Sequence, residues 1–145
     1  PYRILNPGEE RVDENTKIII AIRLKKCKED LRSAALLIEQ GMPRIAVSRA
    51  YYAVFTIATA ALLVFDIRRH KHSAIESAVH EYLVKPKLIE PEYGAIYRQA
   101  FEHRLEADYA DEAEFTTENA RSILAEAERF VARLEEYLRD RGAIE

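Results

Sequence analysis

The chain has 145 residues, of which 48% are hydrophobic and 32% charged, and its 22 basic and 25 acidic side chains give a net charge of −3. This length fits one domain with a substantial core, and only four glycines and five prolines argue against a many-stranded fold. The acidic balance carries no general signature of nucleic-acid binding, so any contact with RNA requires a local basic patch.

Residues 1–14 contain two prolines, a glycine and several charges, and we expect an extended arm without the apolar segment of a signal peptide. A single helical domain is expected to occupy residues 15–141. Asn15 or Thr16 can cap the first helix, which is predicted to stop at Gly41, the usual residue type just after a helix end.

The first helix carries an apolar seam with alternating steps of three and four residues, which predicts contact with a partner helix. The seam consists of Leu24, Cys27, Leu31, Ala34 and Ile38. Cys27 is therefore expected to be a buried, inert thiol. Because Cys27 is the single cysteine, an internal disulfide and a cysteine-based zinc site are excluded, and a reducing cytoplasm is the expected compartment.

The segment 43–65 is apolar on nearly every side and has no charge from Ala50 to Phe65. These sixteen residues are fewer than the roughly 20 that span a bilayer, so we expect a central core helix and no membrane contact. Pro43 suits its first turn, and the short link after Gly41 requires an antiparallel hairpin with the first helix. One face has mostly small side chains, which let a neighbouring backbone approach closely: Ala46, Ala50, Ala53, Ile57, Ala60 and Val64.

Two helices are predicted in the middle of the chain. Ser73 and Glu76 have the spacing of a capping box and predict the start of the third helix, which ends before Pro86. Pro91 opens the fourth helix, and the acid-rich stretch 107–115 breaks it.

A fifth helix is predicted from a cap at Thr116 or Thr117 to Gly142. No segment alternates with period two for long enough to predict a strand. The predicted fold class is therefore all-α, an up-and-down bundle of about five antiparallel helices.

Arg98 and His103 are the first candidate catalytic pair. A histidine can transfer protons near neutral pH and an arginine can hold a phosphate, which together would support metal-free RNA cleavage. Five residues correspond to about 140° of rotation on a helix, so the two side chains flank a groove unless a second subunit supplies the partner residue. A surface arginine and histidine on a charged helix are the alternative interpretation.

Arg104, Asp108 and Tyr109 follow directly. Arg104 and Asp108 have the i,i+4 spacing of an ion pair that would close the helix. The alternative is that they border a polar functional groove together with Tyr109.

The loop after Phe65 is strongly basic and is the candidate site for a phosphate of RNA or of a nucleotide. Its candidate phosphate-binding residues are Arg68, Arg69, Lys71 and His72. The loop precedes a predicted helix N-terminus, where backbone N–H groups favour anions. A solvated charged loop is the alternative.

His72, Glu76 and His80 are four residues apart, which is similar to metal-ligand spacing. His72 is expected to precede the helix, however, and no fourth ligand is near in sequence. We therefore predict no metal site and no cofactor.

Three segments share an order and spacing with one known family: SRAYYAVFTIATAALLV on the second helix, KHSAI on the third and HRLEADY on the fourth. With the first helix they resemble the small stand-alone HEPN-domain proteins of bacteria and archaea, over residues 16–138. The RAYYA and R-x-x-x-D-Y elements carry most of the resemblance.

The resemblance implies a helical bundle, a homodimer and a partnership with a minimal nucleotidyltransferase (MNT) in a toxin–antitoxin or nucleotide-binding pair. It also implies a metal-independent ribonuclease site with an R-x4–6-H motif at the dimer interface, which Arg98 and His103 match in letter. If Arg104 is the motif arginine instead, Asp108 and Tyr109 stand where an active enzyme has its histidine. In toxins with an R-x4-H-x-Y motif the partner adenylylates the tyrosine, and this sequence has Leu105 at that position, so Tyr109 is the only nearby substitute.

The leading functional prediction is the toxin-like, RNA-directed component of an MNT-paired system. A catalytically degenerate module that binds a nucleotide or a partner protein is the main alternative. A ligand-binding regulatory bundle without a nucleic-acid role also fits the acidic net charge.

Overall fold

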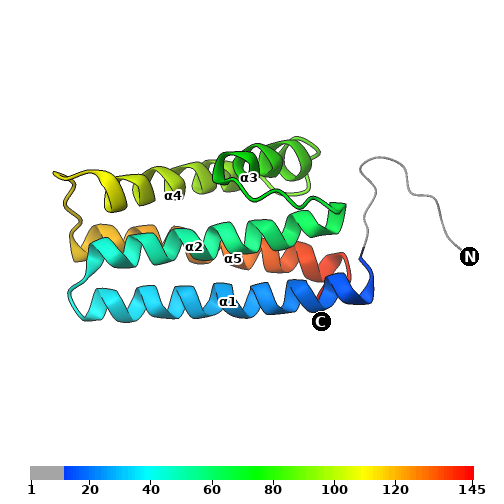
Figure 1. The fold of residues 1–145 in the computed structure, drawn as a ribbon, viewed down its shortest axis with the longest axis horizontal. Coiled ribbons are helices and arrows are strands. Elements are labelled where there is room, and N and C mark those ends of the chain that lie inside the picture. Colours follow the sequence, from blue (N-terminus) through cyan, green and yellow to red (C-terminus); the bar gives the residue numbers. More distant parts are fainter. Residues whose placement is uncertain (1–11) are drawn as a thin grey trace, which may run out of the picture.

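The computed structural model describes residues 12–145, which form an antiparallel helical bundle (Figure 1). The elements are α1 (Glu14–Glu39), α2 (Pro43–Leu62), a 3-10 turn η1 (Leu63–Phe65), α3 (His72–Ala78), a π-helical segment η2 (Val79–Val84), α4 (Pro91–Tyr109) and α5 (Thr117–Asp140). The described residues contain no strand, which confirms the predicted all-α class. The predicted arm at residues 1–14 lies outside the described residues except for its last three positions.

The bundle is organised around α2. In Figure 1, α1 lies along one side and α3 with α4 along the other, with α2 and α5 between them. Helix α2 packs most extensively against α1 and then against α5 and α4. Its small-residue face is fully buried, and Tyr51 and Leu62 on other faces are buried as well. Close packing on all sides explains why this helix has almost no polar positions.

Pro43–Phe65 is also the one helix among the described residues that is long and apolar enough to cross a membrane. Of its most apolar window, 67% is buried inside the bundle. That burial is expected of a core helix, because a lipid-facing helix would expose its apolar side chains outward.

The hairpin of α1 and α2 has the predicted geometry but a different first cap. Asp13, and not Asn15 or Thr16, caps α1, and its carboxylate accepts a hydrogen bond of 2.7 Å from the backbone N–H of Thr16. Gly41 follows the helix end with φ +75°, a left-handed conformation that glycine adopts without strain. Cys27 is fully buried, as predicted, and burial raises the pKa of its thiol to about 12, which disfavours the reactive thiolate.

The predicted capping box at Ser73 and Glu76 is wrong. Helix α3 begins one residue earlier, at His72, with Lys71 as N-cap and no side-chain cap. The Glu76 carboxylate lies 3.8 Å from Arg98 on α4 and does not return to the helix start. The fifth helix, by contrast, is capped as predicted, because the Thr116 hydroxyl accepts a hydrogen bond of 3.0 Å from the N–H of Asn119.

Candidate functional site

Arg104 lies at the centre of a polar cluster between α2, α4 and the start of α3. Its guanidinium donates a hydrogen bond of 3.1 Å to the hydroxyl of Tyr52 on α2. Its Nε lies 2.8 Å from Asp108 Oδ2, one turn further along α4, in an ion pair that is not an aligned hydrogen bond. The Arg104 side chain is only 12% exposed. The predicted i,i+4 pair is confirmed, and it holds this cation at a fixed place.

Aromatic rings surround the Arg104 guanidinium. Its central carbon lies 5.5 Å from the ring centres of Tyr52 and Tyr109 and 5.8 Å from that of Tyr51. Arg49 covers the Tyr52 ring as well, at 4.7 Å, so two guanidiniums lie against this one tyrosine. Cations over ring faces are stabilised by the ring quadrupole and keep their charge for a further ligand.

His72 joins the cluster through Tyr51. The two side chains share a hydrogen bond of 2.5 Å between the Tyr51 hydroxyl and His72 Nδ1, and the imidazole stacks at 4.4 Å on Phe55. Burial, and second the charge of Arg104, lower the pKa of His72 below its ordinary value. The site therefore combines a fixed guanidinium with a histidine that is mostly neutral at pH 7. We call the whole set the Arg104 cluster: Ser48, Tyr51, Tyr52, His72, Arg104, Asp108 and Tyr109.

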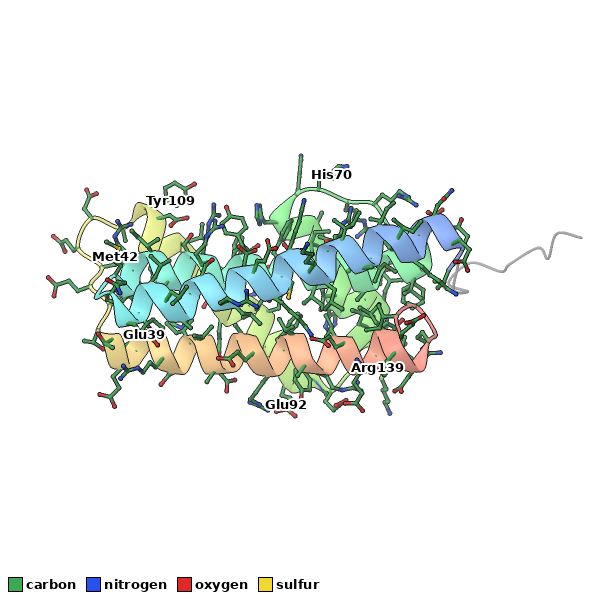
Figure 2. All side chains as sticks on the ribbon, turned by 90° about the horizontal axis from the view of Figure 1, so that it is seen from below. Glu39, Met42, His70, Glu92, Tyr109 and Arg139 are labelled. Atoms are coloured by element: carbon green, nitrogen blue, oxygen red, sulfur yellow. The ribbon has the colours of Figure 1, made fainter. Side chains whose placement is uncertain are left out.

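Ser48 and Tyr109 complete the cluster at its outer edge. The Ser48 hydroxyl lies 3.4 Å from Asp108 Oδ2 and donates to it. Tyr109 is the most exposed large hydrophobic residue of the described chain, at 70%. It lies at the end of the bundle where Met42 joins α1 to α2 (Figure 2).

Arg98 and His103 are not brought together within one chain. Arg98 is 70% exposed and pairs with Glu102 on its own helix at 3.1 Å and with Glu76 at 3.8 Å. The His103 ring is turned toward α5 and meets Phe115, in the link before that helix, edge-on at 6.4 Å. This divergence follows from the five-residue spacing on a regular helix.

His103 also borders a small cavity of about 160 Å³ between α4 and α5, beside Gln99 and Ser122. Its Nδ1 is buried and has no hydrogen-bond partner among the described residues. A second copy of the chain would have to supply an arginine if His103 acts as part of a composite site.

The four predicted phosphate-binding residues divide into two groups. Arg68, Arg69 and Lys71 are exposed, and Arg68 pairs with Asp66 at 3.0 Å. His72 is half-buried and belongs to the Arg104 cluster. It is also not grouped with Glu76 and His80 as a metal site, since no three His, Cys, Asp or Glu side chains of residues 12–145 gather in a way that could hold a metal ion.

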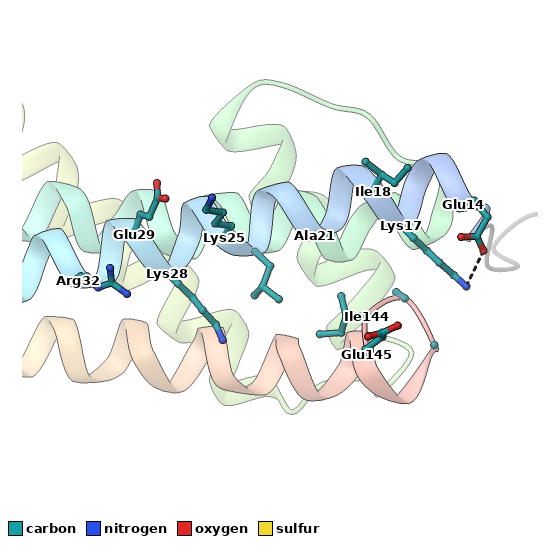
Figure 3. A pocket seen from close by; sticks show the side chains of 13 residues that line it. Glu14, Lys17, Ile18, Ala21, Lys25, Lys28, Glu29, Arg32, Ile144 and Glu145 are labelled. Atoms are coloured by element: carbon teal, nitrogen blue, oxygen red, sulfur yellow. Dashed lines mark hydrogen bonds and ion pairs between the residues drawn. The ribbon is translucent and has the colours of Figure 1, made fainter.

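A second groove lies along α1, away from every predicted site residue. It has a volume of about 940 Å³ and runs between α1 and the residues after α5 (Figure 3). Its walls carry both signs of charge, with Lys17 paired to Glu14 at 3.5 Å, and its apolar residues include Ile18 and Ile144. Such a mixed surface offers no clear preference for an anion or a cation.

Ser48, Tyr51 and Tyr52 belong to the site but were not predicted from the sequence. A usable signal was present, since Ser48, Tyr51, Tyr52 and Phe55 follow the i, i+3, i+4, i+7 spacing of one helix face. A hydroxyl-rich stripe on an otherwise apolar helix requires polar partners, which here are Arg104, Asp108 and His72.

Comparison with known proteins identifies the family. A model of the HEPN domain matches residues 20–137, which include all of the Arg104 cluster. The chain belongs to the HEPN domain family. The resemblance drawn from the RAYYA and R-x-x-x-D-Y segments is thereby confirmed.

Curated relatives of this HEPN chain come from bacteria and archaea. A "UPF0332 protein" of Thermotoga maritima is 34% identical over 129 residues, which cover 89% of this chain and 97% of the relative. A protein of Methanocaldococcus jannaschii named "Putative toxin" is 38% identical over 113 residues, covering 78% of this chain and 84% of the relative. A further "UPF0332 protein" from Pyrococcus horikoshii is 40% identical over 70 residues, 48% of this chain and 49% of its own.

Proposed function

We propose that this HEPN protein is the toxin-like component of a cytoplasmic two-protein system and that it cleaves RNA without a metal ion. The observation that carries the proposal is the Arg104 cluster, in which the Arg104 guanidinium and the His72 imidazole are held by hydrogen bonds to the adjacent hydroxyls of Tyr52 and Tyr51. The M. jannaschii relative named as a toxin supports the toxin-like role.

The chemistry requires one cation and one group that transfers protons. The ribose 2′-OH gives its proton to a base and attacks the adjacent phosphorus, the bond from phosphorus to the 5′-oxygen breaks, and the protonated base returns that proton to the leaving 5′-oxygen. Arg104 would stabilise the negative charge of the pentacoordinate phosphorus, and His72 would act as the base. In the composite alternative, His103 of one chain and Arg98 of a second chain take these roles.

We also propose an MNT-type nucleotidyltransferase as partner, with Tyr109 as the residue that it modifies. The phenolic oxygen would attack the α-phosphorus of a nucleoside triphosphate and release pyrophosphate. Tyr109 is 70% exposed and its ring lies 5.5 Å from the Arg104 guanidinium. A nucleotide on this hydroxyl would add negative charge at the edge of the cluster and block access to Arg104.

One observation favours a second function, a binding module without catalysis. Asp108 already neutralises Arg104 at 2.8 Å, and an incoming phosphate must compete with this carboxylate. A chain that binds a nucleotide or a partner protein and does not cleave RNA would be compatible with this pair.

The deciding experiment measures cleavage of a fluorogenic single-stranded RNA by the purified protein in excess EDTA. We expect cleavage that EDTA leaves unchanged, and at least a hundredfold loss in His72→Ala and Arg104→Ala. His80→Ala, which removes an exposed histidine outside the cluster, is the matched control and should match wild type.

Each outcome assigns the site. Loss of activity in His103→Ala and Arg98→Ala, with His72→Ala active, would place the reaction at the composite site. If wild type never cleaves RNA and none of these variants differs from it, the nuclease proposal fails and the binding module remains.

The homodimer is tested separately, by sedimentation equilibrium at micromolar concentration. Leu105 and Tyr109 are exposed apolar side chains one turn apart on α4, and a second copy could cover them. We expect about twice the 16.7 kDa chain mass. A monomer throughout this range would remove the composite site.

A further inference from the structure

A basic groove lies next to the Arg104 cluster, and the proposed chemistry does not use it. Its volume is about 410 Å³, and it is formed by α1, α2 and the loop that follows η1. The lining residues are Arg23, Lys26, Phe55, Thr56, Thr59, Ile67, Arg68, Arg69 and His70. We call this set the basic groove.

The charge of the basic groove is strongly one-sided. Four of its nine residues are arginine or lysine and none is aspartate or glutamate. Asp66 pairs with Arg68 from outside the lining at 3.0 Å, and Asp30, one turn after Lys26 on α1, interacts with Lys26. Arg23 and Arg69 have no carboxylate partner within residues 12–145. Burial, and second the nearby charge of Arg68, lower the pKa of Arg23, so an anion placed between them would relieve an existing repulsion.

The two sides of the groove come from segments far apart in the sequence. Arg23 and Lys26 are three residues apart on α1 and therefore face the same way. Arg69 comes from the loop after η1, where its guanidinium also lies 5.9 Å from the Tyr82 ring centre. A surface that happens to be basic because of one charged helix would not have this two-sided arrangement.

Phe55 connects the groove to the Arg104 cluster. It is part of the groove lining, and its ring also stacks at 4.4 Å on His72. Figure 2 shows His70, from the groove, and Tyr109, from the cluster, along the same edge of the bundle. A ligand with several phosphate groups and at least one base could therefore occupy the groove and extend past Phe55 toward Arg104.

We propose that the basic groove binds adjacent phosphate groups, supplied either by the backbone of a single-stranded RNA or by the phosphate chain of a free nucleotide. The basis is that cations from α1 and from the loop after η1 line one groove together with Phe55, Thr56 and Thr59 of α2. Its extension to Arg104 rests on the proposed function, but phosphate binding in the groove does not.

The test uses a fluorescent oligoribonucleotide of about 12 nucleotides, with 2′-O-methyl groups so that it cannot be cleaved, and measures its Kd by anisotropy. The double variant Arg23→Gln/Lys26→Gln should weaken binding about tenfold. It should also reduce the slope of log Kd against log salt by about 1.4, because each phosphate contact on a single strand contributes about 0.7. Arg69→Gln, at an exposed loop position, should reduce the slope by about 0.7.

The matched control is Lys85→Gln/Arg121→Gln, which also removes one lysine and one arginine charge, but from exposed positions outside the groove. Its Kd should stay within about twofold of wild type. Equal weakening in the groove variants and in this control would show that only net charge matters and would overturn the proposal.

Competition separates the two phosphate sources. Displacement of the labelled strand by ATP at micromolar concentration, lost in Arg69→Gln, identifies a free nucleotide as ligand. Displacement only by unlabelled oligonucleotides identifies the strand. Cleavage of unmodified RNA is followed in parallel. If the groove variants bind more weakly and wild type does not cleave RNA, the groove proposal holds and the nuclease proposal fails. If wild type cleaves RNA and the groove variants bind like wild type, only the groove proposal fails.

Discussion

The Tyr51 hydroxyl connects the fold to the candidate site, and removing it gives a sharp prediction. Tyr51 and Tyr97 are both fully buried, and their hydroxyls lie 3.4 Å apart, while Tyr51 also bonds to His72 at 2.5 Å. Tyr51→Phe keeps the ring but leaves the Tyr97 hydroxyl buried without this partner. The lost hydrogen bond to His72, together with the Tyr97 hydroxyl that is left buried and unsatisfied, should lower the free energy of unfolding by about 1.5–3 kcal/mol.

The partner substitution should cost less. Tyr97→Phe removes only the long contact, and Tyr51 keeps His72, so we expect a loss of about 0.5–1 kcal/mol. In the double variant both buried hydroxyls are absent and the half-buried His72 can turn to water. The double variant should therefore be no less stable than Tyr51→Phe alone, a coupling of at least 0.5 kcal/mol between neighbouring residues.

Equilibrium urea unfolding followed by circular dichroism, at pH 7.5 where His72 is neutral in both states, measures all three variants. Equal m-values would show that the denatured states are comparable. If Tyr97→Phe costs as much as Tyr51→Phe and the two losses add, the hydroxyls act independently and the network argument is refuted.

Three other measurements test the fold and the site. Ala53→Leu should lower the free energy of unfolding by about 1–3 kcal/mol, because Ala53 is fully buried on the small-residue face of α2. The control Ala125→Leu, at an exposed helical position, should change it by less than about 0.5 kcal/mol. An unfolding midpoint that Ala53→Leu leaves unchanged would contradict the packing of this face. Thr116→Ala should cost about 1 kcal/mol in the same urea assay through loss of the α5 cap, and no loss would show that another group caps this helix. Burial, and second the charge of Arg104, lower the pKa of His72, so below about pH 6.5 the unfolded chain binds more protons than the folded one. Stability should therefore fall as the pH drops through that value, and His72→Gln should make this fall smaller. Identical stability–pH profiles of wild type and His72→Gln would reject the lowered pKa.

Local chemistry predicted much of the fold because each signal depends on few residues. Gly41 can take positive φ, Pro43 can open a helix, and the Thr116 hydroxyl can reach a backbone N–H three residues on. The wrong cap at Ser73 has a tertiary cause. Glu76, which a capping box would use, instead lies toward Arg98 on another helix, at 3.8 Å.

The candidate site was harder to predict, since spacing along one helix fixes angles but not the neighbours on other helices. The i,i+4 pair of Arg104 and Asp108 was accessible from the sequence for that reason. The contact of Arg104 with Tyr52 spans 52 positions, and that of Tyr51 with His72 spans 21. Only the packing of α2 against α4 and α3 shows that these residues form one cluster.

The Arg104–Asp108 pair sets the condition under which this cluster can act on a phosphate. The guanidinium is 12% exposed and is fixed by Tyr52, whereas the carboxylate is 25% exposed and lies at the last turn of α4, next to Tyr109. An incoming phosphate would therefore displace the carboxylate and not the arginine. Because the phosphate replaces the Asp108 carboxylate at the same guanidinium, the attraction that it gains is largely offset by the attraction to Asp108 that is lost. Affinity must then come from additional phosphate contacts, and the basic groove beyond Phe55 is the adjacent surface whose charge can supply them.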